Sequence, residues 1–183
     1  MKIEQSTAIK LRITEIESLD PITVFLEDHD VGKGKIIIEC YGKSWSAYWG
    51  GMGSKLADFF VSCNHEYLIN NLAPQMDKYE PDFDTFKDEM RQKICEMRAD
   101  SYISKDLARE LYDVEDWSQY VTANPYEPLR NPCFICSDEF EELDFDVFDV
   151  PERITTDYRY LTRIVKSVQS ALVEAGLTSK EAA

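Results

Sequence analysis

Residues 138–149 combine closely spaced carboxylates with apolar side chains. The stretch holds seven acids among twelve residues, and acidic and apolar residues alternate strictly from Glu142 to Val147, as in an edge strand that carries one row of carboxylates. Such a row can occupy the Lys and Arg sites that a nucleic-acid-binding protein keeps for phosphates. We therefore predict a partner-binding surface here. Its charged contacts would come from Asp138, Glu139, Glu141, Glu142, Asp144, Asp146 and Asp149, and its apolar anchors from Phe145 and Phe148.

The negative charge of the chain is concentrated in its middle. The net charge is −15, and residues 76–152 hold 22 acids against 8 bases, whereas residues 1–75 hold 10 against 7 and residues 153–183 hold 3 against 5. A simpler interpretation is a solvated edge whose charges prevent pairing with a second chain. Either way the surface repels polyanions, so we expect no direct binding of nucleic acid.

Cys133 and Cys136 form a CxxC pair, a spacing that lets two thiolates bind one zinc ion or exchange a disulfide. A structural zinc site needs four ligands, and the other candidates, Cys63, His65 and Cys95, lie far upstream without a second CxxC. Buried thiols that fill space are therefore the favoured interpretation. We predict no cofactor and no metal site, and Cys133 and Cys136 remain candidate metal ligands. The acidic turn at Asp28, His29 and Asp30 could also bind a metal, but a solvated turn is the favoured interpretation.

The glycine-rich stretch 50–55 could bind an anion, because glycines allow close backbone approach and a following helix offers free N–H groups. It does not fit the GxxxxGK[ST] pattern, so a tight strand-to-helix turn is the simpler interpretation. The aromatic residues Trp45, Tyr48 and Trp49 could stack bases, but such platforms lie in positively charged grooves. Core packing of the two tryptophans is favoured.

Catalytic signals are lacking. The two histidines, His29 and His65, do not have the serine or cysteine context of a hydrolase triad. The 35 acids single out no pair whose pKa values are pushed apart. We therefore expect a protein that is not an enzyme.

The elements that position these residues follow from hydrophobic periodicity. Residues 1–53 are predicted to be β-rich, with strands near 8–13, 22–26, 36–40 and 45–49, and Trp45, Ala47 and Trp49 share one face of the last strand. Residues 54–112 are predicted to be helical, with Ser54 as the first N-cap and helices at 65–72, from 82, and at 104–112. Residues 113–152 are acidic and irregular or an edge strand, and residues 153–183 form a C-terminal helix that Gly176 closes.

These elements predict an α+β fold in which a small antiparallel β-meander packs against several helices, with an acidic central segment. We expect a single domain over residues 1–183, because a chain of this length and hydrophobic content can bury one core. The start of the chain lacks a signal peptide, and no apolar run approaches the roughly 20 residues of a membrane helix. Five mostly widely spaced cysteines argue against a disulfide framework. A cytoplasmic protein without membrane contact is expected.

Two stretches carry a resemblance to a known group. Residues 34–53, GKIIIECYGKSWSAYWGGMG, and residues 157–172, DYRYLTRIVKSVQSAL, resemble small acidic proteins encoded by bacteriophages and prophages of enterobacteria. The two ends match better than the acidic middle. The resemblance implies a phage or prophage setting, in the cytoplasm of a host bacterial cell, and it transfers no site residue.

The leading hypothesis is a phage accessory protein that binds and inhibits a host nucleic-acid-handling complex of the CRISPR or restriction type. The acidic block would act as a nucleic-acid mimic, and the partner would be a host nucleic-acid-binding protein. One alternative is a small metal- or nucleotide-dependent phage enzyme. Another is a self-associating phage structural or assembly protein, which would use the helix faces at 83–97 or 158–172. The oligomeric state is left open by the sequence.

Overall fold

The computed structural model describes residues 1–3, 5–123, 132–134 and 148–179. The chain forms two compact units. Unit 1 contains Met1–Lys78 and Thr155–Ala183, and unit 2 contains Tyr79–Ile154. Each unit has its own hydrophobic core. Unit 2 is therefore an insertion in the chain of unit 1. The expected single domain remains a prediction, and it can be tested by asking whether the two cores unfold together.

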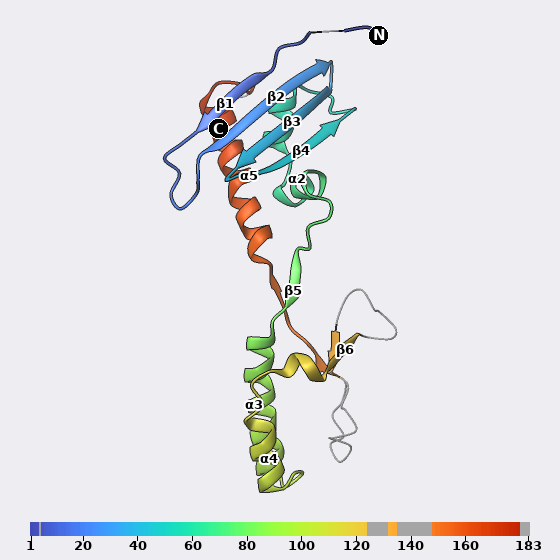
Figure 1. Ribbon diagram of the computed structural model, residues 1–183, viewed down its shortest axis with the longest axis vertical. Helices are drawn as coiled ribbons and strands as arrows, with labels where there is room; N and C mark the ends of the chain where they lie inside the picture. The colour runs from blue at the N-terminus through green and yellow to red at the C-terminus, as the bar shows by residue number, and fades with distance from the viewer. Residues whose placement is uncertain (4, 124–131, 135–147, 180–183) are drawn as a thin grey trace. The chain divides into compact units, whose positions relative to one another are not determined.

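A four-stranded antiparallel sheet forms the first half of unit 1. Its strands are β1 (Ile9–Ile13), β2 (Ile22–Asp30), β3 (Lys33–Cys40) and β4 (Lys43–Trp49), and their order in the sheet is the order in the chain. The predicted β-meander is confirmed (Figure 1). Its strands arise from period-two burial, since Ile22, Val24 and Leu26 are buried and the residues between them are partly exposed.

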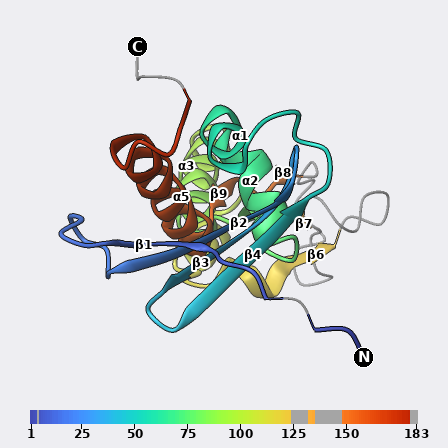
Figure 2. The same cartoon turned by 90° about the horizontal axis from the view of Figure 1, so that it is seen from above.

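Three helices cover one face of this sheet, α1 (Leu56–Ser62), α2 (His65–Leu72) and α5 (Thr156–Glu174), as Figure 2 shows. On β4, Ala47 and Trp49 are buried and Trp45 is partly buried against the same core, whereas Ser46 and Tyr48 are exposed. The predicted face of β4 is therefore correct. Fully buried side chains of this core include Phe60, Ile22, Ile36, Ile38, Leu56, Leu68 and Ile69.

Unit 2 begins and ends with a short antiparallel pair, β5 (Tyr79–Pro81) and β9 (Glu152–Ile154). Between them lie α3 (Phe83–Ala99), α4 (Lys105–Tyr112) and the 3-10 helix η1 (Trp117–Tyr120). Three short strands follow, β6 (Val121–Ala123), β7 (Pro132–Phe134) and β8 (Phe148–Asp149), paired in the order β6-β7-β8. The core of unit 2 contains Phe86, Met90, Ile94, Ile103, Leu111, Trp117 and Val150.

The helix ends show why these segments fold where they do. Asp82, Ser104 and Thr155 each accept a hydrogen bond from a backbone N–H three residues later, at the start of α3, α4 and α5. The chain after α5 turns at Gly176, with a φ of 66°, so the predicted glycine close is correct. The predicted N-cap Ser54 is wrong, because Lys55 occupies that position in α1 and has no side-chain cap hydrogen bond.

Candidate functional site

Most of the predicted acidic block falls outside the described residues. Phe148 and Asp149 form β8, whose backbone pairs with Phe134 and Cys133 of β7. The side chains of these four residues are outside the description. So are the whole residues Asp138, Glu139, Glu141, Glu142, Asp144, Phe145 and Asp146, together with Cys136. The strict alternation from Glu142 to Val147 therefore stays a sequence-based prediction.

The division of the chain into units separates its charge. Unit 2 contains 21 acids and 8 bases, a net charge of −13, whereas unit 1 contains 14 acids and 12 bases, a net charge of −2. The boundary between the units is set by backbone packing and not by charge. Nearly all the excess negative charge therefore belongs to one inserted unit.

Helix α3 carries a row of exposed acids that the analysis of the sequence did not single out. Asp84, Asp88 and Glu96 are exposed at intervals of four or eight residues, and Asp100, the C-cap, continues the spacing. Residues four apart lie on one side of a helix, here the side away from the buried Phe86, Met90 and Ile94. The row is readable from the spacing alone. It provides regularly placed carboxylates on a rigid element.

Some acids of unit 2, including Asp84 of the α3 row, are paired with nearby bases. Arg153 of β9 donates to Glu80 at 2.9 Å and to Asp84 at 3.3 Å. Lys87 and Arg91 of α3 donate to the Glu115 carboxylate at 3.3 and 2.9 Å. The hydrogen bond from Lys87, followed by its charge, lowers the pKa of Glu115. The carboxylate of Glu115 thus stays ionised at neutral pH and joins α3 to the segment after α4.

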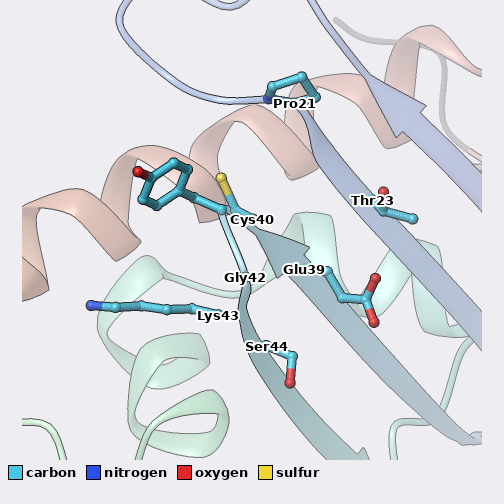
Figure 3. Close-up of a pocket in the computed structure, with 8 residues that line it drawn as sticks. Pro21, Thr23, Glu39, Cys40, Gly42, Lys43 and Ser44 are labelled. Carbon is cyan, nitrogen blue, oxygen red and sulfur yellow. The ribbon is translucent and has the colours of Figure 1, made fainter.

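Unit 1 has a polar pocket of about 440 Å³ at the end of β3, shown in Figure 3. Thr23, Glu39 and Ser44 face one another across β2, β3 and β4 in register. They supply two hydroxyls and one carboxylate, which can accept or donate hydrogen bonds. The complete lining is Pro21, Thr23, Glu39, Cys40, Tyr41, Gly42, Lys43 and Ser44.

A strained turn forms one edge of this pocket. Tyr41 and Gly42 have φ values of 47° and 73°, the positive values that a two-residue hairpin turn requires. Glycine adopts them freely, but a bulky side chain rarely does. The ring of Tyr41 is 80% exposed, so packing does not explain the choice of tyrosine at this position.

The buried thiol of Cys40 contacts a tyrosine of α5. The Cys40 Sγ lies 3.3 Å from the hydroxyl of Tyr160 and 3.6 Å from the backbone carbonyl of Asp20, to which it donates. The hydrogen bond with Cys40, together with burial, raises the pKa of Tyr160 to about 12. The Cys40 thiol is therefore packed and hydrogen-bonded inside unit 1.

The glycine-rich turn does not leave an anion site at the start of α1. Met52 donates its backbone N–H to the carbonyl of Gly32 at 2.7 Å, which joins the glycine-rich turn to the turn between β2 and β3. The N–H of Leu56, in the first turn of α1, is donated to the Asp28 carboxylate at 3.0 Å. A carboxylate therefore already occupies the place where a phosphate would bind, and its charge would repel one.

The described parts of the chain contain neither a cluster of metal ligands nor a helix that could span a membrane. There, no three His, Cys, Asp or Glu side chains gather as metal ligands. Cys63 and His65 belong to unit 1 and Cys95 to unit 2, and burial raises the pKa of the Cys63 thiol. None of the described helices is long and apolar enough to span a membrane.

The comparisons with known proteins agree with the phage setting. No curated protein and no solved structure matches the chain significantly. The model of Phage_phiTE_072, described as a phage family, matches residues 1–174, which include all of unit 2 and nearly all the described part of unit 1. The chain therefore belongs to this phage family.

Proposed function

We propose that this phage protein binds and inhibits a host nucleic-acid-handling defence complex, such as a CRISPR effector or a restriction enzyme, through the acidic surface of unit 2. The observation that carries the proposal is the charge separation: an inserted unit has a net charge of −13, and the unit that contains the sheet is nearly neutral. An acidic composition needed only for solubility would not require this separation.

The partner would present a groove whose Lys and Arg side chains normally bind phosphates. Carboxylates in a row along α3, including Asp88 and Glu96, would meet these cations on a rigid support. Long-range attraction would make association fast, and salt would weaken it, because the Debye length falls to about 8 Å at physiological ionic strength. Inhibition would follow from exclusion of nucleic acid from the groove.

The acidic block is proposed as the second part of this surface. Asp138, Glu139, Glu141, Glu142, Asp144, Asp146 and Asp149 would add charged contacts, with Phe145 and Phe148 as apolar anchors. The block and the α3 row belong to the same unit. They can be neutralised separately, which makes their contributions distinguishable.

The test is an affinity pull-down of tagged protein from a bacterial lysate at low and moderate salt, followed by mass spectrometry. One variant carries Asn or Gln at the seven acids of the block, and a second carries Asp84→Asn, Asp88→Asn, Glu96→Gln and Asp100→Asn. A matched control neutralises four exposed acids of unit 1, with Glu15→Gln, Glu17→Gln, Glu39→Gln and Glu174→Gln.

The proposal expects the native protein and the unit 1 control to recover a nucleic-acid-binding complex, and at least one unit 2 variant to lose it. The recovered complex should then lose nucleic-acid binding when the native protein is added. Equal recovery by all four proteins would mean that the acids of unit 2 serve solubility alone, and the proposal would fail.

The self-association alternative has less support. The apolar faces that it would use, at 83–97 and 158–172, are buried inside the cores of their own units, as Phe86, Met90, Tyr158 and Leu161 illustrate. An interface between copies would have to use other side chains.

A further inference from the structure

A groove runs between α3 and α4, which lie side by side in Figure 1. Its volume is about 340 Å³, within the range of pockets that bind small ligands or peptide side chains. Residues 105, 108, 109 and 112 have the spacing of one helix face, so α4 forms one wall. The lining residues are Ile94, Cys95, Arg98, Lys105, Ala108, Arg109, Tyr112 and Asp113.

Three cations surround the groove in a unit that is otherwise strongly acidic. Arg98, Lys105 and Arg109 are exposed, and the structure records no ion pair between them and other described residues. They are three of the eight bases of unit 2, and Asp113 is the one acid among the lining residues. The local charge of the groove is thus opposite in sign to that of the unit.

The same lining also has an apolar part. It consists of the buried Ile94, the partly buried Ala108 and the exposed Tyr112. A ligand that fits both features needs an apolar group flanked by negative charges. Arg side chains bind carboxylates through two parallel hydrogen bonds, so Arg98 and Arg109 supply the chemistry that such charges need.

Arg91 of α3 holds Tyr112 of α4 in place. Arg91 donates its Nε–H to the backbone carbonyl of Tyr112 at 3.2 Å, and its guanidinium carbon lies 5.2 Å from the centre of the Tyr112 ring. The same guanidinium is paired with Glu115 at 2.9 Å. The groove is therefore formed before a ligand arrives, which reduces the entropy cost of binding.

We infer that this groove binds an acidic peptide segment of a partner protein, with an apolar side chain on Ile94 and Ala108 and carboxylates on Arg98, Lys105 and Arg109. At physiological salt the Debye length is about 8 Å, so these cations act on a short segment more strongly than distant acids of the unit do. A long polyanion would also meet those acids, which disfavours nucleic acid. The inference does not depend on the proposed inhibition. The α3–α4 groove would bind an acidic peptide, whereas the acids of unit 2 would bind a cationic groove of the host complex.

Fluorescence anisotropy with a labelled peptide of sequence Glu-Leu-Glu-Phe-Glu-Leu would test the inference on the full-length protein. The triple variant Arg98→Gln, Lys105→Gln and Arg109→Gln should bind at least about tenfold more weakly, as the loss of charge-assisted hydrogen bonds implies. Lys93→Gln removes an exposed cation of α3 outside the groove, and should leave binding unchanged. Ala108→Trp should fill the groove and also abolish binding.

Cys95 provides a second readout, because its exposed thiol lines the groove. Bound peptide should slow its alkylation, located by mass spectrometry, in the native protein but not in the triple variant. Equal binding of Lys-Leu-Lys-Phe-Lys-Leu, displacement of the acidic peptide by ATP, or unchanged binding by the triple variant would each overturn the inference. Binding of dodecanoate without binding of the peptide would also overturn it, in favour of a small apolar anion.

Discussion

The carboxylate of Asp28 accepts a hydrogen bond from the backbone N–H of Leu56 at 3.0 Å, and so joins β2 to the first turn of α1. Because Lys55 gives α1 no side-chain cap, this contact replaces the usual N-cap. Asp28→Ala should lower the free energy of unfolding by about 1 kcal/mol, the usual cost of a lost cap. Urea denaturation would measure it.

Asp28→Asn should lower the free energy of unfolding less than Asp28→Ala does, because the amide oxygen can still accept the hydrogen bond. Asp88→Asn is the control, since Asp88 is exposed on α3 without a hydrogen bond or ion pair to another described residue. An unchanged stability in Asp28→Ala would show that solvent satisfies the Leu56 N–H equally well.

Tyr160 should ionise later than an ordinary tyrosine. Its pKa is raised from 10.0 to about 12 by the hydrogen bond with Cys40 and by burial. The unfolded chain therefore releases this proton first, so the stabilising contribution is complete below pH 10 and is lost as the pH rises toward 12. Ultraviolet titration of the native protein against Tyr160→Phe would isolate the late phenolate signal.

Cys40→Ala removes the first cause of that shift, and should move the titration of Tyr160 toward lower pH. The free energy of unfolding of the native protein should fall above pH 10 more steeply than that of Tyr160→Phe. Identical titration curves for the native protein and Cys40→Ala would contradict the role given to the thiol.

The two cores should respond separately to cavity-creating changes. Phe60 is fully buried in unit 1 and Phe86 is 1% exposed in unit 2. Replacing either with Ala should destabilise its own core by about 3–5 kcal/mol. Hydrogen exchange followed by mass spectrometry should then show loss of protection confined to the unit that carries the change.

The prediction of a single domain implies the opposite result, a loss of protection in both units. If the chain unfolds as one cooperative domain, Phe86→Ala must lower the protection of β2 and β3 as much as that of α3. The same pair of variants therefore decides between one cooperative domain and two units that open independently.

Tyr41→Asn should stabilise the protein by about 1 kcal/mol, because asparagine tolerates a positive φ better than tyrosine. Little packing is lost, since the Tyr41 side chain is 80% exposed. Tyr48→Asn is the matched control, because Tyr48 is exposed within β4, where tyrosine is the better residue. It should lower the melting temperature, and a fall in both variants would show that Tyr41 makes a contact worth more than its strain.

Local patterns in the sequence predicted most elements of the fold. The apolar run Ile36–Ile38 after a glycine-containing turn indicated a strand, and the spacing of Phe86, Met90 and Ile94 indicated a helix. These patterns depend on neighbouring residues alone. They carry no information about which distant segments pack together.

The partition into units depended on such distant contacts. Tyr79 pairs with Ile154, and Cys40 contacts Tyr160 across 120 positions of the chain. The prediction of Ser54 as the N-cap of α1 was wrong for the same reason. The side chain that accepts a hydrogen bond from the start of this helix is Asp28, which lies 28 residues before Leu56. Charge composition located the acidic region, but the α3–α4 groove required two helices to be placed side by side.

The chain leaves unit 1 after Lys78 and re-enters it at Thr155. The Thr155 N–H donates a hydrogen bond to the Lys78 carbonyl, with the nitrogen 3.0 Å from the oxygen, and so holds these two points together. Because both atoms belong to the backbone and both residues belong to unit 1, the contact that closes this unit involves no side chain of residues 79–154.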